Sequence, residues 1–257
     1  MRCGLVTITL VYLTIQKCER YLVHGTRNRN LSSYHNKVFV CMARTSKLSI
    51  TNQNCIRILS FDPGMNNTGW AISNYNIVNK GFDVLKYGTI KASRMAEKQK
   101  DLTNRHGKQI VAINILKQEI TKLVIDSVPD YVASEDTFYN PRTPNAYKSL
   151  LLCLFSIDNI LFNMYYYKEE CNLNETASKL HKISPKTIKM VMSGTGNSFK
   201  VDMLEALKKQ YSEKAITFSQ YPDAPFEDFQ NTLTEHSIDA VSCGFSFAKS
   251  VYPQLVV

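Results

Sequence analysis

A short stretch of the chain, ILSFDPGMNNTGWAIS at residues 58–73, places one aspartate between two apolar runs. The first run ends at Asp62, and Pro63 and Gly64 follow directly, which are residue types that stop a strand and start a turn. The second apolar run begins near Trp70. The stretch therefore predicts two strands joined by a tight connection, with a carboxylate fixed at the end of the first strand.

The remainder of residues 55–257 predicts a mixed α/β domain. Short apolar runs bounded by turn residues predict strands at 56–62, 68–75, 84–90, 129–136 and 177–183. Longer segments with helical spacing predict helices at 93–127, 145–168, 184–194, 201–211 and 232–251, and residues 223–230 are expected to form a loop. Short loops join the first three strands, so we expect an antiparallel meander within one mixed sheet that is flanked by helices.

Three of the expected helices carry further signals. The helix at 184–194 has Ser184 as its N-cap, Pro185 at its first position and Gly194 at its end. The helix at 145–168 is apolar almost all round, so it must be buried on most faces, either inside the domain or against a partner chain. The first half of the helix at 93–127 is basic, which suits either a DNA arm or a solvated face.

Most of the net charge of +9 lies outside this domain. Residues 1–54 hold eight lysines and arginines and one acid, which accounts for +7, so a nucleic-acid argument must rest on local clusters in the body. We exclude this basic extension from the fold and expect poor order there. Its composition suits an organellar transit peptide, but it could also lie upstream of a natural start at Met42.

The cysteines and the lengths of the apolar runs indicate in which cellular compartment the protein is expected. The seven cysteines are odd in number and form no C-x-x-C pair, which favours a reducing compartment over a disulfide framework or a zinc module. No apolar run reaches 18 residues, so no membrane span is expected. We expect a cytoplasmic protein of a bacterial or phage-infected cell, or an organellar protein if residues 1–54 are a transit peptide.

Four residues far apart in the sequence could form one site. Asp62 and Glu135 each end a predicted strand, and they would emerge at the same end of the sheet if those strands are neighbours. His236 and Asp239 are three residues apart on a predicted helix and therefore share a face. Oxygen-rich sites with one imidazole suit Mg²⁺ or Mn²⁺. Taken singly, each residue could be a turn, a solvated strand end or a surface histidine; only the joint arrangement predicts a metal site.

Four stretches in the same order resemble RuvC-type Holliday junction resolvases, which have the RNase H-like fold. They are FDPGMNNTGW at 61–70, ASEDTF at 133–138, SPKTIKMVMSGTGNSFK at 184–200 and EHSIDAVSCGFSFA at 235–248. The resemblance covers about residues 56–250. It departs from the family pattern at His236, where the first of two acidic residues usually stands. Some members and relatives of the family carry histidine there.

The resemblance implies a structure-specific endonuclease that resolves four-way DNA junctions. Asp62, Glu135, His236 and Asp239 would bind two Mg²⁺ ions, with Mn²⁺ as a substitute, and the products would carry 5′-phosphate and 3′-hydroxyl ends. Lys189 and Lys200 match basic positions of the family that hold phosphates, and Phe138 matches an aromatic that stacks on an opened base. A junction is approximately two-fold symmetric, so a homodimer is expected, with the helix at 145–168 as its interface.

Two other readings of these residues remain open. A related RNase H-like nuclease that acts on flaps, forks or RNA–DNA hybrids would use the same metal chemistry. An actin-like ATP-binding phosphotransferase shares the early strand–turn–strand, but it usually needs a second D-x-G phosphate loop, and we find none in the sequence. GTGNSFK at 194–200 also lacks the spacing of a P-loop.

Overall fold

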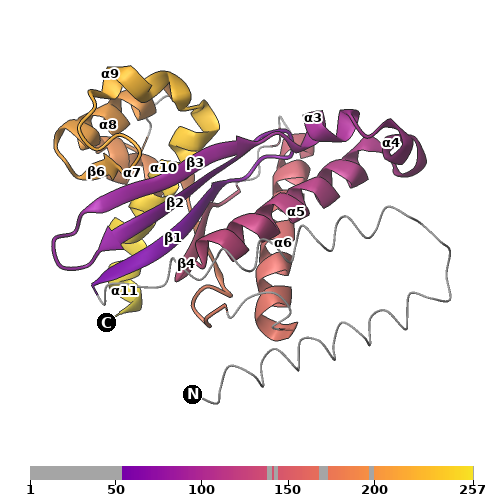
Figure 1. Ribbon diagram of the computed structural model, residues 1–257, viewed down its shortest axis with the longest axis horizontal. Coiled ribbons are helices and arrows are strands. Elements are labelled where there is room, and N and C mark those ends of the chain that lie inside the picture. The colour runs from indigo at the N-terminus through magenta and orange to yellow at the C-terminus, as the bar shows by residue number, and fades with distance from the viewer. Residues whose placement is uncertain (1–53, 138–140, 142–143, 168–172, 197–199, 257) are drawn as a thin grey trace, which may run out of the picture. The chain divides into compact units, whose positions relative to one another are not determined.

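A mixed six-stranded sheet forms the centre of the described chain (Figure 1). The computed structural model describes residues 54–137, 141, 144–167, 173–196 and 200–256. The strand order across the sheet is β5-β4-β1-β2-β3-β6. The strands are β1 (Cys55–Asp62), β2 (Thr68–Asn76), β3 (Phe82–Ile90), β4 (Tyr131–Glu135), β5 (Leu180–Ile183) and β6 (Ile216–Phe218).

The pairing of the strands confirms the predicted architecture. β1, β2 and β3 form the antiparallel meander, and β4 pairs with β1 in parallel. β5 adds to β4 in parallel, and β6 adds to β3 in parallel. The short strand β6 was not predicted, because three residues between two turns carry no periodicity that can be read.

Helices cover both faces of the sheet (Figure 1). The helices before β5 are α3 (Ala92–Glu97), α4 (Lys100–His106), α5 (Lys108–Ser127) and α6 (Pro144–Tyr167). Those after β5 are α7 (Pro185–Ser193), α8 (Lys200–Ser212), α9 (Phe226–Phe229), the 3₁₀ turn η2 (Gln230–Thr232), α10 (Glu235–Ser246), the π-helical turn η3 (Phe247–Val251) and α11 (Tyr252–Leu255). Ser184 caps α7 by accepting a hydrogen bond from the Thr187 N–H, as expected.

Three helix predictions need correction. The expected helix at 93–127 is three helices, and its second break falls at Gly107, whose φ of 83° lies outside the helical region. The expected loop at 223–230 contains the short helix α9. The closing helix, expected at 232–251, begins at Glu235 because Thr234 caps it, and it changes to a π-helical turn after Ser246.

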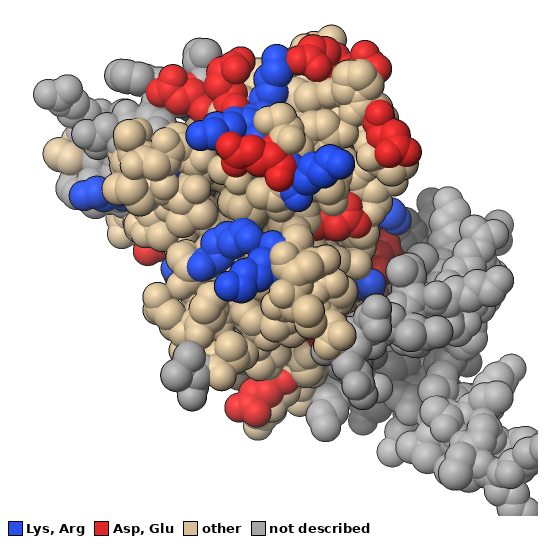
Figure 2. Space-filling model, turned by 90° about the vertical axis from the view of Figure 1, so that its left-hand side faces the viewer, with Lys and Arg blue, Asp and Glu red and all other residues tan. Residues whose placement is uncertain are grey.

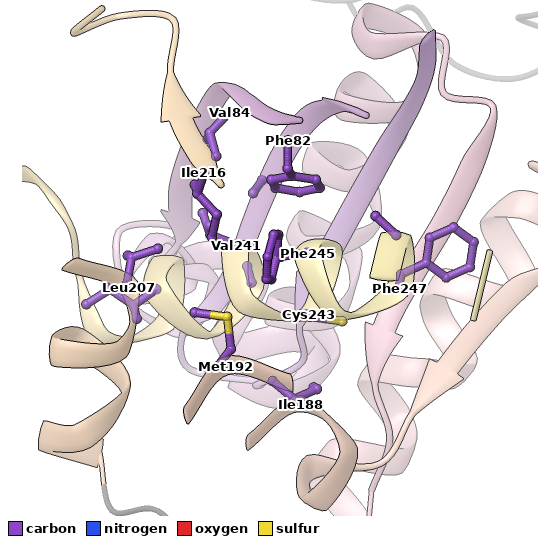
Figure 3. Close-up of a cluster of buried hydrophobic side chains, with 14 of the residues drawn as sticks. Phe82, Val84, Ile188, Met192, Leu207, Ile216, Val241, Cys243, Phe245 and Phe247 are labelled. Carbon is purple, nitrogen blue, oxygen red and sulfur yellow. The ribbon is translucent and has the colours of Figure 1, made fainter. Parts of the chain in front are cut away.

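The core forms two layers, one on each face of the sheet. Ile58, Ala71 and Ala133 face the layer that contains α7, α8 and α10. Leu59 and Val132 face the other layer, which contains α3, α5 and α6. Figure 3 shows the first layer, in which Val241 and Phe245 of α10 pack toward the sheet. Since side chains alternate along a strand, these assignments fix which face every neighbouring residue meets.

One face of α6 is apolar and exposed. Leu151, Phe155, Phe162 and Tyr166 recur at helical spacing, and the side chain of Phe155 is 66% exposed. The rings of Phe162 and Tyr166 stack with their centroids 5.5 Å apart. Within the described residues, α6 is also long and apolar enough to cross a membrane by length and composition alone, but 39% of its most apolar window is buried in the domain.

Two predictions fall on residues that the structure does not describe. The basic extension at 1–54 lies outside the described residues except for Asn54. Phe138, expected to stack on a base, also lies outside them, as does the side chain of Lys200.

Candidate metal and nuclease site

Two strand ends bring the first two predicted residues together. β1 and β4 are parallel neighbours, with Phe61 beside Ser134, so Asp62 and Glu135 end adjacent strands at the same edge. Asp62 lies two residues after Ser60 and Glu135 two after Ala133, and both pairs face the α10 layer. The two carboxylates therefore rise from neighbouring strands at one end of the sheet, the arrangement expected if these strands are neighbours, and they lie on one face of it.

Helix α10 lies unusually close to this face because small residues line it. A Cβ atom on Gly69 would lie 1.9 Å from the backbone oxygen of His236, so only glycine fits at that position. Further along α10, a Cβ atom on Gly244 would lie 2.7 Å from Oγ of Ser60. The Ser60 hydroxyl donates to the carbonyl of Ala240 at 2.8 Å. These contacts bring α10 directly over the end of β1 and the start of β2.

Asp62 and His236 meet across this contact. Nδ1 of His236 lies 2.7 Å from Oδ2 of Asp62, although the two residues are 174 positions apart. The Asp62 side chain is 16% exposed and that of His236 is 33% exposed. In the tautomer that carries its hydrogen on Nδ1, this hydrogen donates to the carboxylate and the lone pair lies on Nε2, which suits metal binding.

Asp239 completes the set of acids near the site. It follows His236 by three residues on α10, so the two lie on one face of the helix. Burial raises the pKa of the Cys243 thiol, one turn further along, well above its usual range, and the negative charges of Glu135, Asp62 and Asp239 raise it further. The negative charges of all three carboxylates therefore act on the buried thiol of Cys243.

The donors in this region fit a divalent ion by their chemistry. Three carboxylates and one imidazole are the hard, oxygen-rich set that Mg²⁺ and Mn²⁺ prefer. Within the described residues, no three His, Cys, Asp or Glu side chains are grouped closely enough to hold one ion as they stand.

The turn after Asp62 is held in place by Thr68 and by Cys153 of α6. The Thr68 hydroxyl donates to the carbonyl of Gly64 at 2.6 Å, which closes the turn. Sγ of Cys153, on α6, lies 3.9 Å from the same hydroxyl. Burial raises the pKa of the Cys153 thiol to about 11, so it packs as a neutral group. Helix α6 thus supports the loop that follows the first candidate ligand.

The residues expected to bind DNA are less well defined. Lys189 lies on α7 and is half-buried. A pocket of about 420 Å³ lies between α7 and α8, and Gly194, Asp202 and Lys209 are among the residues that line it. The face in Figure 2 carries acidic and basic side chains interspersed over its upper part. Lys208 of α8 is not free to contact DNA in this state, because it pairs with Glu227 of α9 at 2.6 Å.

Sequence reasoning missed the residues that support the ligands. Ser60 and Cys243 lie beneath the carboxylates, and their small size allows the close packing of α10. Gly69 was noted only as part of the FDPGMNNTGW stretch at 61–70, and its role as a contact point for α10 depends on tertiary structure. The signal for it in the sequence was a glycine inside a strand, which often marks close approach of another backbone.

The strand order, with a meander followed by parallel strands and helices on both faces, defines an RNase H-like fold. No protein-family model and no curated protein matches the sequence. Among solved structures, RuvC from Thermus thermophilus is similar with 15% identity and a TM-score of 0.52, over 77% of this chain and 97% of that chain. T. thermophilus RuvC in complex with a Holliday junction substrate gives 14% identity and a TM-score of 0.53, over 78% and 96%.

Within the RNase H-like class, the fold is therefore similar to that of RuvC. The resemblance noted in the sequence is confirmed at the level of the fold.

Proposed function

We propose that the chain is an endonuclease that resolves four-way DNA junctions by metal-dependent hydrolysis of phosphodiester bonds. The observation that carries the proposal is the contact of 2.7 Å between Oδ2 of Asp62, at the end of β1, and Nδ1 of His236 on α10. Glu135 ends the neighbouring parallel strand β4 at the same edge of the sheet. The RuvC fold supports it, since one of the similar structures is RuvC bound to a Holliday junction substrate.

Asp62, Glu135, His236 and Asp239 would hold two Mg²⁺ ions, for which Mn²⁺ would substitute. When bound, such a pair lowers the pKa of the attacking water and neutralises the leaving 3′-oxygen, which yields 5′-phosphate and 3′-hydroxyl ends. The protein's part is to fix the donors. The 2.7 Å bond to Asp62 orients the imidazole of His236, and the tight packing of α10 on Gly69 sets the height of both α10 donors above the sheet.

Binding of DNA would use sequence-independent contacts around this site. Lys189 and Lys200 would contact phosphates, and Phe138 would stack on a base opened at the crossover, a contact worth about 1–3 kcal/mol. The chain would act as a homodimer, because symmetric cutting of a junction needs two sites related by a two-fold axis. The exposed apolar stripe on α6, formed by Leu151, Phe155, Phe162 and Tyr166, would supply the interface.

The decisive experiment compares a synthetic four-way junction with linear, forked, flapped and RNA–DNA hybrid duplexes, each with Mg²⁺ and with EDTA. We expect Mg²⁺-dependent cleavage that favours the junction, and junction binding without cleavage in Ca²⁺. Preference for flaps, forks or hybrids would instead favour a related RNase H-like nuclease. Saturable ATP hydrolysis without DNA would favour an actin-like phosphotransferase. Cleavage that persists undiminished in excess chelator would refute the metal chemistry.

The variant that tests the site is Asp62→Asn. Its amide oxygen can still accept from Nδ1 of His236, so the packing is kept while the negative charge is lost. We expect cleavage to fall on the order of 10³-fold or more, with junction binding intact, because metal clamping supplies several kcal/mol. Asp83→Asn is the matched control, since Asp83 is a strand carboxylate that accepts hydrogen bonds from Thr217 and Ser219 at β6, on the other edge of the sheet. Loss of binding in Asp62→Asn would make residue 62 structural.

A further inference from the structure

A row of three residues runs across the sheet beneath the start of α10. Asp62 pairs with Gly69, and Gly69 pairs with Thr89 on β3. Residues directly opposite one another on neighbouring strands point to the same face, so all three face α10. Because strands lie about 4.8 Å apart, Asp62 and Thr89 are about 10 Å apart, which is roughly the width of a helix.

The first turn of α10 fills the gap between these two side chains. The backbone of His236 sits where a side chain of residue 69 would be, since a Cβ atom there would lie 1.9 Å from its carbonyl oxygen. On one side, Nδ1 of His236 meets Asp62 at 2.7 Å. On the other side, Oγ1 of Thr234 meets Oγ1 of Thr89 at 2.6 Å. The helix start is therefore held from both sides.

Thr234 is also the residue that fixes the start of the helix. Its hydroxyl accepts from the N–H of Ser237 at 3.1 Å, and the Ser237 hydroxyl accepts from the N–H of Thr234 at 2.8 Å. This reciprocal capping box sets the orientation of the first turn. A bond from Thr89 to the capping hydroxyl thus acts on the rigid turn that carries His236.

We propose that Thr89 is a positioning residue that holds the first turn of α10 so that His236 meets Asp62. The inference rests on the proposed function, because it concerns the geometry of the same site. Thr89 does not touch substrate or metal; it acts through Thr234. Without its hydroxyl, the capping residue Thr234 would lose its bond to β3, and the first turn could move toward β1.

A second hydroxyl pair nearby provides a matched control. The Tyr87 hydroxyl meets Oγ1 of Thr232, two residues before the cap, and Tyr87 lies on the same strand as Thr89 and faces the same side. Tyr87→Phe therefore removes one hydroxyl bond between β3 and the same connection, but it leaves the capping hydroxyl of Thr234 engaged. Thr89→Val removes the hydroxyl of Thr89 at nearly constant shape, and Thr89→Ser restores it.

The first measurement uses the full chain without metal or DNA. The long-range ¹⁵N–¹H spectrum of the His236 imidazole, assigned with a His236→Gln variant, reports which ring nitrogen carries the hydrogen. We expect Thr89→Val to shift or broaden the His236 signals, and Thr89→Ser and Tyr87→Phe to keep the wild-type pattern. An unchanged spectrum in folded Thr89→Val would overturn the proposal.

The second measurement is Mn²⁺ affinity and single-turnover junction cleavage at saturating protein. We expect Thr89→Val to weaken Mn²⁺ binding and slow cleavage by about 10- to 100-fold at unchanged junction affinity, since misplacing a reacting group by about 1 Å has effects of this size. Thr89→Ser should return both to within about threefold of wild type. Equal losses in Tyr87→Phe would mean that both hydroxyls only stabilise the fold, which would overturn the proposal. If wild type cleaves no junction, the proposed function fails, and the imidazole spectrum still decides the role of Thr89.

Discussion

Replacing Gly69 with alanine tests how closely α10 must lie on the sheet. The added Cβ atom would lie 1.9 Å from the carbonyl oxygen of His236 and 2.4 Å from its carbonyl carbon. Cβ atoms are not found closer than 3.0 Å to such backbone atoms, so the helix start must move by about 1.1 Å or more. Neither obstructing atom belongs to a flexible side chain, so a change of rotamer cannot relieve the clash.

A movement of this size acts on the site and on stability together. It would lengthen the 2.7 Å bond between Asp62 and His236 and displace Asp239 on the same helix. Because a misplacement of about 1 Å can cost about 100-fold in rate, we expect single-turnover cleavage of a four-way junction to fall about 100-fold in Mg²⁺. Overpacking of a close contact should also lower the free energy of unfolding by about 1–3 kcal/mol.

Gly88→Ala separates these two effects. A Cβ atom there would lie 2.9 Å from the indole of Trp70, which packs on the opposite face of the sheet. We expect Gly88→Ala to lose stability without losing cleavage rate. The assays are thermal unfolding and junction cleavage on the same samples. A folded Gly69→Ala protein that cuts at the wild-type rate would refute the tight docking of α10.

Three further predictions concern regions around the site. The Cys153 thiol, whose pKa is raised to about 11, should stay neutral and unreactive toward thiol reagents at pH 8. Because the usual pKa of a cysteine is near 9, the thiol's contribution to the free energy of unfolding should be present below pH 9 and lost between pH 9 and 11. Unfolding titrations of Cys153→Ala should show a smaller loss of stability over that pH range. Ser184→Ala should lower the free energy of unfolding by about 1 kcal/mol in denaturant titrations, because the cap of α7 is lost; an unchanged midpoint would contradict the capping role. Phe155→Glu should shift the proposed dimer to a monomer in sedimentation experiments. Val78→Glu is the control, because Val78 is 72% exposed and lies outside α6, and it should leave sedimentation unchanged. A wild-type sedimentation pattern in Phe155→Glu would exclude α6 as the interface.

The sequence predicted those parts of the fold whose signal is local. Apolar runs that end at turn residues gave β1 and β2, and Ser184 with Pro185 gave the start of α7. The break at Gly107 was missed because helical spacing continues on both sides of it, and a glycine within such a pattern does not by itself reveal a positive φ. The strand β6 was missed because it is defined by pairing with β3, which is a tertiary property.

The sequence predicted the candidate ligands of the site, but it did not predict the residues that position them. Asp62 and Glu135 could be placed at strand ends, and their nearness depended on one assumption about neighbouring strands, which the parallel pairing of β1 and β4 confirms. The bond from His236 to Asp62 and the contact of Thr89 with Thr234 could not be read from the sequence, because both depend on how α10 docks. The roles of Phe138 and Lys200 stay predictions.

The 174-residue separation between Asp62 and His236 has a consequence for how the molecule acquires activity. Contacts between residues so distant in sequence require a large loop to close, which costs conformational entropy. A partly folded chain whose α10 has not docked holds Asp62 and Glu135 without their partners. The proposed site would therefore be complete only in chains in which α10 has docked on the sheet.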